Sequence, residues 1–390
     1  MELTREEQLM LDGEYGEGNA KAMAILSAIG KIYGADRLIP VSSVQVAGVS
    51  YKTIGDAGLE FLEDFASKGA RASVPSFLNP AGMDLENWRE MKIPERFAVK
   101  QLRIIDAYRS MGIMATCTCT PYLVGITPKL GEHVAWSESS ALSYANSMLG
   151  ARTNRESAVS ALAAAIIGKT PNFGLHLDEN RKAKLLVKVE ARVERISDFG
   201  ALGVFVGRLA KERIPAFEGL ERKAATADRM KSLGAAMAAS GSVALYYAKG
   251  ITPEYVLDEE HDELVFEQRD LEETKERMQS ADAVDIVTIG CPHCSLEEIA
   301  GVAKLVRGKK LKVMLWVCTA RRIKEEADRL GYTRTIEEAG GRVVADTCMV
   351  VSPIEEMGYR ATGVNSGKAA TYLPSFCRQK VAFKEVEELL

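Results

Sequence analysis

The chain has 390 residues, of which 47% are hydrophobic and 27% are charged, close to the averages for globular proteins. This composition excludes a mostly disordered chain, a collagen-like chain and a small disulfide scaffold, because there is ample apolar surface to bury. The formal net charge is −4, from 50 basic and 54 acidic side chains, so there is no basic excess to bind a nucleic-acid backbone. No apolar stretch approaches the roughly 20 residues of a membrane span.

The N-terminal segment MELTREEQLM is acidic and amphipathic and lacks the basic and apolar regions of a signal peptide. Thr4 followed by Glu7 predicts a capping box that opens a helix. We therefore expect a cytoplasmic protein. Its seven cysteines are then free thiols rather than disulfides, because the cytosol is reducing. Free thiols act as buried hydrophobic groups, as metal or cluster ligands, or as nucleophiles.

The first half of the sequence predicts helices that alternate with short strands. Apolar periodicity, with glycines such as Gly34 as stop signals, predicts helices over residues 4–12, 19–33, 56–67, 97–110, 139–149 and 156–168. Short apolar and β-branched runs predict strands over residues 37–47, 72–75, 113–116 and 184–193.

The second half is more regular. A helix over 225–239 and a strand over 242–248 precede a charged helix over 271–280. Three strand-then-helix units follow, at 284–289 and 295–306, at 313–317 and 322–330, and at 342–345 and 366–372. This alternation predicts an α/β fold with parallel sheets flanked by helices. The charged stretch around residues 258–269 is the candidate boundary, which divides the chain into N-terminal (1–257) and C-terminal (258–390) α/β regions.

Six of the seven cysteines follow predicted strands: Cys117, Cys119, Cys291, Cys294, Cys318 and Cys348. Ligands of open α/β sheets bind outside the carboxyl ends of the strands. Six thiols near strand ends are also more than the packing of a hydrophobic core requires, so we consider a role in ligand or metal binding. Cys318 follows the apolar run Leu315-Trp316-Val317 and is assigned to the core, as is Cys117 less firmly.

Cys291-Pro292-His293-Cys294 admits three interpretations. A thioredoxin-like redox motif normally belongs to a small unit, and a structural zinc site normally has a second cysteine pair close by. In the third, three thiolates from distant strand ends hold an iron–sulfur cluster with one open iron site, which acts as a Lewis acid. The spacing alone does not decide among them.

The motifs taken together resemble the aconitase X family. The resemblance rests on Cys119-Thr120-Pro121-Tyr122-Leu123, on residues 131–141 with Trp136-Ser137-Glu138-Ser139-Ser140-Ala141, and on residues 146–156 with Gly150-Ala151-Arg152-Thr153-Asn154-Arg155-Glu156. Further matches are Gly168-Lys169-Thr170-Pro171, Gly290-Cys291-Pro292-His293, Asp346-Thr347-Cys348 and Asn365-Ser366-Gly367-Lys368. They run in order from about Gly48 to Lys368, and the runs around Trp136 and Arg152 are highly specific.

The resemblance implies an aconitase-like large subunit built from several α/β units, and a hydro-lyase activity that depends on iron and sulfur. Two activities are known in the family. We favour the archaeal one, dehydration of (R)-5-phosphomevalonate to trans-anhydromevalonate 5-phosphate in a modified mevalonate pathway to isoprenoids. The end of the chain at Leu390 leaves no room for a fused small subunit, so a separate small subunit is the expected partner. The alternatives are cis-3-hydroxy-L-proline dehydration and, from another class, a zinc-stabilised or redox scaffold subunit.

The resemblance also implies roles for individual cysteines. Cys119, Cys291 and Cys348 lie inside matching motifs and are the expected ligands of a cluster, with 4Fe-4S favoured over 2Fe-2S. Cys377 is the main rival for the third ligand, and Cys294 is assigned to packing. No catalytic residue is assigned in this chain, because the base in this superfamily is usually a serine on the small subunit.

Substrate-binding residues are expected in two loops and on two basic side chains. Gly48-Val49-Ser50 and Asn79-Pro80 are small or polar segments whose N–H groups could approach a phosphate or carboxylate; both could instead be ordinary turns. Arg152 and Lys368 are the expected cations, whereas Arg155 is more typical of surface charge. His133 and His293 are interpreted as structural histidines.

Overall fold

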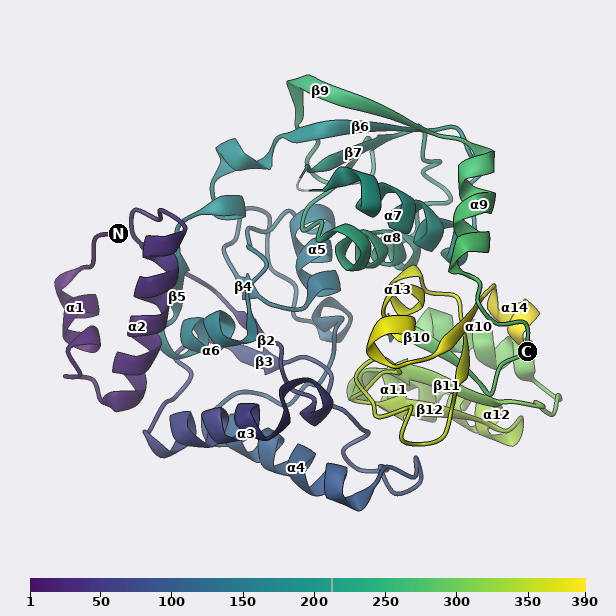
Figure 1. Ribbon diagram of the computed structural model, residues 1–390, viewed down its shortest axis with the longest axis horizontal. Helices are drawn as coiled ribbons and strands as arrows, with labels where there is room; N and C mark the ends of the chain where they lie inside the picture. Colours follow the sequence, from purple (N-terminus) through teal and green to yellow (C-terminus); the bar gives the residue numbers. More distant parts are fainter. Residues whose placement is uncertain (212) are drawn as a thin grey trace.

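Four β-sheets organise the computed structural model, which describes residues 1–211 and 213–390. In the view of Figure 1 the N-terminal helices lie at one side, the C-terminal five-stranded sheet lies at the other, and a four-stranded sheet lies above them. All strand pairs except β1–β5 are parallel. The predicted class, α/β with parallel sheets flanked by helices, is confirmed.

The N-terminal part packs helices around a short parallel sheet ordered β3-β2-β4. Its elements are α1 (Arg5–Leu11), α2 (Glu17–Ile32), β1 (Leu38–Pro40), β2 (Val44–Val46), α3 (Tyr51–Ser67), β3 (Ser76–Leu78), α4 (Glu95–Ser110), the 3₁₀ turn η1 (Pro121–Val124), β4 (Ala135–Trp136), α5 (Ser139–Met148), α6 (Ala158–Ile167), β5 (Lys169–Pro171), η2 (Gly174–His176) and η3 (Asp178–Arg181). Thr4 and Glu7 form the predicted capping box at the start of α1. All three residues of β2 are buried, as is typical of a central parallel strand that is covered on both faces.

The middle part is a four-stranded parallel sheet ordered β8-β7-β6-β9. Its elements are β6 (Ala183–Val189), α7 (Ile196–Ala210), β7 (Pro215–Glu218), α8 (Ala227–Gly241), β8 (Tyr247–Ala248) and β9 (Leu257–Phe266). Glycines allow α7 and α8 to approach closely: a Cβ on Gly203 would lie 2.6 Å from the carbonyl oxygen of Leu233. The charged stretch chosen as a boundary forms β9 and the start of the next helix, and the division at 257/258 stays a prediction.

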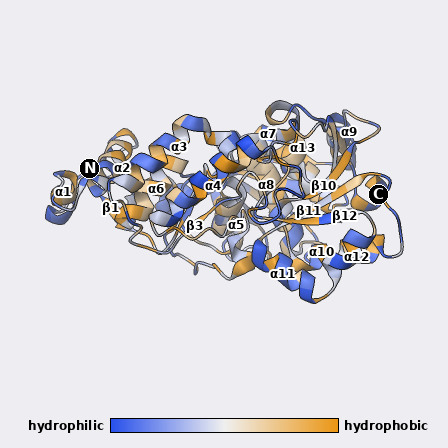
Figure 2. Cartoon of the chain, turned by 90° about the horizontal axis from the view of Figure 1, so that it is seen from below, coloured by the Kyte–Doolittle hydropathy of each residue, from blue (hydrophilic) through white to orange (hydrophobic). Residues whose placement is uncertain are grey.

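The C-terminal part is a five-stranded parallel sheet ordered β12-β11-β10-β13-β14. Its elements are α9 (Gln268–Met278), β10 (Ile286–Cys294), α10 (Leu296–Val306), β11 (Met314–Thr319), α11 (Arg321–Arg329), α12 (Tyr332–Glu338), β12 (Gly341–Ala345), β13 (Ala361–Val364), α13 (Gly367–Phe376), β14 (Lys380–Phe383) and α14 (Val386–Leu389). Hydrophilic residues dominate α11, one of its outer helices (Figure 2).

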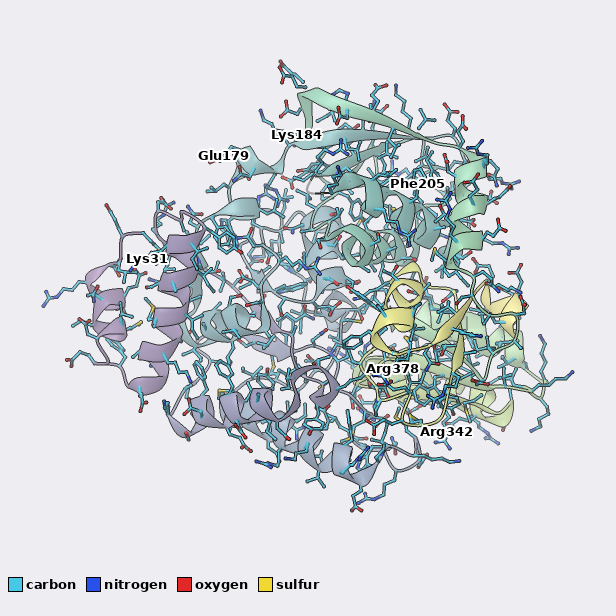
Figure 3. All side chains as sticks on the ribbon, viewed as in Figure 1. Lys31, Glu179, Lys184, Phe205, Arg342 and Arg378 are labelled. Atoms are coloured by element: carbon cyan, nitrogen blue, oxygen red, sulfur yellow. The ribbon has the colours of Figure 1, made fainter. Side chains whose placement is uncertain are left out.

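Side chains such as Lys31, Glu179 and Lys184 point outward at the periphery of the molecule (Figure 3).

Several predicted elements differ from the observed ones. The expected strand over 37–47 is two strands in different sheets, because β1 pairs with β5 whereas β2 pairs with β3 and β4. The expected strand over 72–75 is replaced by β3, and that over 113–116 is a single bridge from Met114 to Phe77. Only Tyr247–Ala248 of the expected strand over 242–248 pairs with a neighbour. Helix α3 begins at Tyr51 and has a non-helical residue at Gly55, next to the predicted start at residue 56.

Ionic and polar contacts join the N-terminal and C-terminal parts where their strands end. Asp84 accepts hydrogen bonds from the Arg321 guanidinium at 2.6 Å and from the backbone N–H of Ala345 at 3.1 Å. Arg321 also pairs with Asp346. Ser50 donates a hydrogen bond to the carbonyl oxygen of Val351 at 2.7 Å. These contacts bring the carboxyl ends of β2 and β3 to face those of β10 and β12.

Candidate functional site

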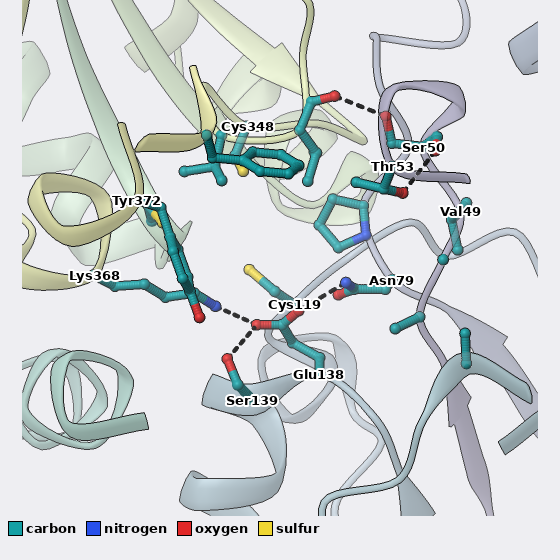
Figure 4. Close-up of a pocket in the computed structure, with 18 of the residues that line it drawn as sticks. Val49, Ser50, Thr53, Asn79, Cys119, Glu138, Ser139, Cys348, Lys368 and Tyr372 are labelled. Carbon is teal, nitrogen blue, oxygen red and sulfur yellow. Dashed lines mark hydrogen bonds and ion pairs between the residues drawn. The ribbon is translucent and has the colours of Figure 1, made fainter. Parts of the chain in front are cut away.

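A cavity of about 440 Å³ opens where the strand ends of the two parts face one another. Its walls include nine of the ten residues predicted to bind substrate or cluster: Gly48, Val49, Ser50, Asn79, Pro80, Cys119, Cys291, Cys348 and Lys368. Figure 4 shows side chains converging on it from loops and helix ends that are far apart in the sequence. The wall also includes Glu138, Ser139 and Tyr372, to which the sequence alone assigned no role.

The three cysteines of the cavity come from three separate elements. Cys119 precedes η1, Cys291 lies within β10, and Cys348 follows β12. All three side chains are buried, with exposed fractions of 4–6%. The interaction between the two buried thiols raises the pKa of Cys291 and lowers that of Cys348. The Cys119 sulfur accepts a hydrogen bond from the backbone N–H of His293 at 3.2 Å.

This donor set fits an iron–sulfur cluster better than a single metal ion. Within residues 1–211 and 213–390, no three His, Cys, Asp or Glu side chains are close enough together to hold one ion. A cluster differs because each thiolate binds a different iron, so its ligands are spread around one cavity. Burial raises the pKa of Cys119 to about 12. A metal centre bound by Cys119 would lower this pKa again, because its positive charge stabilises the thiolate that coordinates it.

Glu138 and Lys368 form a buried ion pair in the cavity wall. Lys368 lies near the start of α13, and Glu138 is the N-cap residue of α5. Burial alone would raise the pKa of Glu138, but the Lys368 ammonium and several hydrogen-bond donors hold it at about 2. One of these donors is the Asn79 side-chain amide, at 2.7 Å. The carboxylate is therefore ionised, and it keeps Lys368 protonated although burial opposes the charge.

Asn79 lines the cavity, and its side chain has a buried hydrogen-bond acceptor without a partner. Its side chain is 8% exposed, and its Oδ1 atom has no hydrogen-bond partner among the described residues. Glu138 fixes the orientation of this amide, because a carboxylate only accepts hydrogen bonds and so takes the NH₂ group. The oxygen is left to accept a hydrogen bond from a bound molecule, since a buried polar atom without a partner is costly.

Backbone amides at the start of α3 form a second polar wall. In the described part of the chain, the N–H groups of Gly48, Val49 and Ser50 have no hydrogen-bond acceptor, whereas those of Ala47 and Tyr51 on either side donate to side chains at 2.6 and 3.1 Å. Gly48 has φ of +72° and leads into the helix N-terminus. Successive free amides at a helix N-terminus form a favourable site for an anion.

Arg152 does not reach this cavity. Its guanidinium forms hydrogen bonds with Glu254 at 2.7 and 3.0 Å and with Asp178 at 2.9 Å, beside the buried Arg181. The acidic partners satisfy its charge and favour a structural role, and its role in substrate binding stays a prediction. Arg155 is exposed and donates to the carbonyl oxygen of Ala238.

The histidines of the motifs lie in two places. His133 contacts His176, with 3.0 Å between their Nδ1 atoms, and neither lines the cavity. His293 is fully buried behind the cavity wall. Burial lowers its pKa to about 4, so the ring is neutral at physiological pH. The prediction that His133 and His293 are structural agrees with these positions.

The other cysteines pack outside the cavity. Cys117 and Cys318 are fully buried in hydrophobic clusters, as predicted. Cys294 belongs to a different cluster from Cys291, so the two ends of the CxxC motif point to different environments. Cys377 accepts a hydrogen bond from the Lys52 ammonium at 3.3 Å, and it is not among the residues that line the cavity.

Known proteins resemble this chain over its whole length. Family models described as the aconitase X first, second and third domains match residues 1–179, 183–276 and 284–390. The chain is 54% identical to the phosphomevalonate dehydratase large subunit of Methanocaldococcus jannaschii over 100% of this chain and 99% of that one. It is 34% identical to the cis-3-hydroxy-L-proline dehydratase of Pseudomonas aeruginosa over 97% of this chain and 67% of that one.

A solved structure shows the same fold. The crystal structure of Thermococcus kodakaraensis aconitase X (holo-form) superposes with a TM-score of 0.94 at 50% identity, covering 100% of this chain and 99% of that one. No described helix is long and apolar enough to cross a membrane. The comparisons confirm the family resemblance and the fold class that the sequence predicted.

Proposed function

This chain belongs to the aconitase X family, and we propose that it is the large subunit of an iron–sulfur dehydratase acting on (R)-5-phosphomevalonate. The product is trans-anhydromevalonate 5-phosphate. The observation that carries the proposal is the single cavity that combines Cys119, Cys291 and Cys348 with the free amides and Lys368. The choice of substrate is supported by four archaeal relatives at 49–55% identity that are named phosphomevalonate dehydratase large subunits.

Cys119, Cys291 and Cys348 would hold the cluster, with 4Fe-4S favoured over 2Fe-2S, and three thiolates leave one iron position without a protein ligand. When bound, the cluster supplies a Lewis acid that helps a substrate hydroxyl to leave as water. The thiol of Cys377 lies outside the cavity, so it is a weaker candidate for the third ligand.

The substrate carries two anionic groups, and the cavity offers two matching sites. The amides of Gly48, Val49 and Ser50 bind the phosphate, because three N–H donors at a helix N-terminus favour a dianion. Lys368 binds the carboxylate and stabilises the negative charge that develops there when the neighbouring carbon loses its proton. Lys368 is the single basic side chain among the described residues that line the cavity.

The hydroxyl group that leaves is oriented by Asn79. At neutral pH the hydroxyl is the hydrogen-bond donor of the substrate, and Asn79, which lines the cavity, has an acceptor atom without a partner among the described residues. When Asn79 accepts this hydrogen, the lone pairs of the hydroxyl oxygen remain free to face Cys119, Cys291 and Cys348. Glu138 supports this arrangement by holding the Asn79 amide and the Lys368 ammonium in place.

The proton acceptor comes from a separate small subunit. Glu138 is the one carboxylate among the described residues lining the cavity, and with a pKa of about 2 it is a poor general base near neutral pH. The designation large subunit among the relatives supports a heterodimer with a second, smaller chain. We place the heterodimer in the cytoplasm, where the free thiols of this chain stay reduced.

A direct assay tests this proposal. The large chain is reconstituted with iron and sulfide under anaerobic conditions, combined with the small subunit of the same organism, and given either (R)-5-phosphomevalonate or cis-3-hydroxy-L-proline. We expect water loss from phosphomevalonate only, because hydroxyproline has no phosphate for the free amides. Turnover of hydroxyproline without turnover of phosphomevalonate would overturn the proposed substrate.

A further inference from the structure

Every hydrogen-bonding group of His293 is used, and the partners lie in the loop of Cys119, in the loop of Cys348 and in helix α8. Its backbone N–H donates to the Cys119 sulfur at 3.2 Å, and its carbonyl oxygen accepts from the Lys231 ammonium at 3.1 Å. Its ring Nδ1 lies 3.0 Å from the Thr118 hydroxyl, and its Nε2 lies 2.9 Å from the carbonyl oxygen of Thr347. The side chain has no solvent exposure.

These contacts determine the tautomer of the ring. A carbonyl oxygen only accepts, so Nε2 carries the hydrogen and donates to Thr347. Nδ1 is then an acceptor and receives the hydroxyl hydrogen of Thr118. The hydroxyl of Thr118 in turn accepts from the backbone N–H of Thr120 at 3.1 Å. The neutral imidazole is thus a directional link from the loop of Cys119 to the loop of Cys348.

We infer that His293 is the positioning residue that sets the separation of the three cysteine loops for the cluster. It lies two residues after Cys291 in the sequence, its ring joins the residues that precede Cys119 and Cys348, and its amide contacts the Cys119 sulfur directly. Partners outside the ligand set orient metal ligands, and losing one typically weakens metal binding about 10- to 100-fold. The inference rests on the proposed iron–sulfur function.

Four variants separate positioning from general stability. His293→Phe keeps the ring volume but removes both side-chain hydrogen bonds, whereas His293→Gln keeps a donor near the position of Nε2. Thr118→Val removes the Nδ1 contact and leaves His293 in place, which covers the case in which the phenylalanine variant fails to fold. His133→Phe is the matched control, because among the described residues the ring of His133 contacts His176 and not the loop of Cys119 or Cys348.

Three readouts are measured on the full chain. Iron and sulfide per chain are titrated after anaerobic reconstitution, with the charge-transfer spectrum of the cluster recorded alongside. Thermal unfolding of the metal-free protein reports folding. The rate at which iodoacetamide alkylates Cys119 and Cys348 in the metal-free protein, followed by mass spectrometry, reports the loops without any cluster.

We expect His293→Phe to weaken iron binding about 10- to 100-fold and to speed alkylation of both cysteines, with His293→Gln and Thr118→Val between it and the wild type. His133→Phe should match the wild type in iron content and alkylation. If His293→Phe folds and its iron binding and alkylation rates equal those of the wild type, the role of His293 is overturned. If His293→Phe does not fold, the same result in Thr118→Val overturns it. A wild-type chain that binds no cluster would overturn the proposed function instead, and the alkylation rates would still decide whether His293 links the loops.

Discussion

The substitution Gly48→Ala tests whether the amides after β2 bind the phosphate. Gly48 has φ of +72°, where an alanine is strained by about 1–2 kcal/mol. A Cβ at this position would also lie 2.9 Å from the Cβ of Ala158 and 3.3 Å from Cγ2 of Ile54. The backbone must therefore shift, and its N–H groups move with it.

The cost to binding follows from the hydrogen bonds that are lost. A hydrogen bond to a charged group contributes about 1.5–3 kcal/mol, and about 1.4 kcal/mol corresponds to a factor of ten in affinity. Misplacing one amide should therefore raise KM for phosphomevalonate about 10- to 100-fold. The value of kcat should change less, because the phosphate binds equally in the ground state and the transition state.

Gly69→Ala is the matched control for this experiment. Gly69 follows the C-terminal end of the same helix with φ of +71°, and a Cβ there would have no neighbouring atom within 4 Å. The substitution carries the same backbone strain without touching the cavity. Steady-state kinetics of both variants decide the question: an unchanged KM in Gly48→Ala, or an equal rise in both variants, would refute the assignment of the phosphate site.

Three further predictions concern other charged groups. Lys368→Met should lower kcat/KM about 10- to 100-fold through loss of a charge-assisted contact, and unchanged steady-state kinetics would argue against its contact with the carboxylate. Burial alone would raise the pKa of Glu138, but its partners hold this pKa at about 2. Its ion pair therefore stabilises the fold fully above about pH 5 and loses this contribution as the pH falls towards 2. The free energy of unfolding should fall less steeply over this pH window for Glu138→Gln than for the wild type. Arg152→Met should lower the unfolding temperature and leave the KM of the folded enzyme unchanged, because Arg152 pairs with Glu254 outside the cavity; a large rise in KM would restore its role in binding.

A residue of the cavity could be predicted from the sequence where a short motif around it was enough to assign it. A cysteine or a glycine in a specific run can be assigned from the run itself, as with Cys119, Cys291 and Gly48. The position of Arg152 outside the cavity was not predictable, because its partners Asp178 and Glu254 lie 26 and 102 residues away. Such distant pairing is not visible in a sequence.

Glu138 was missed for a similar reason. It stands inside a highly specific run, but its importance depends on Lys368, which lies 230 residues later. A carboxylate in a predicted loop is usually at the surface. The buried Glu138–Lys368 pair appears only when α5 and α13 come together at the cavity.

The fold shows the same division between local and distant causes. Helix α7 was not predicted, because Gly200, Gly203 and Gly207 weaken its helical propensity. The structure shows that these glycines face neighbouring backbone, and a Cβ at position 207 would lie only 3.0 Å from Met237 backbone atoms. Close packing on α8 stabilises the helix and overrides the local preference. The first two strand-then-helix units of the C-terminal part needed no such information, because each has a clear local pattern. The third differs, because the unpredicted strand β13 lies between β12 and α13.

The most direct test of the account is the iron and sulfide content of single cysteine variants after anaerobic reconstitution. The cavity predicts that Cys119→Ala, Cys291→Ala and Cys348→Ala each lose the cluster and its brown colour, whereas Cys294→Ala and Cys377→Ala retain both. Retention of a full cluster by any of the first three variants, or a colourless wild-type chain with stoichiometric zinc, would contradict the account.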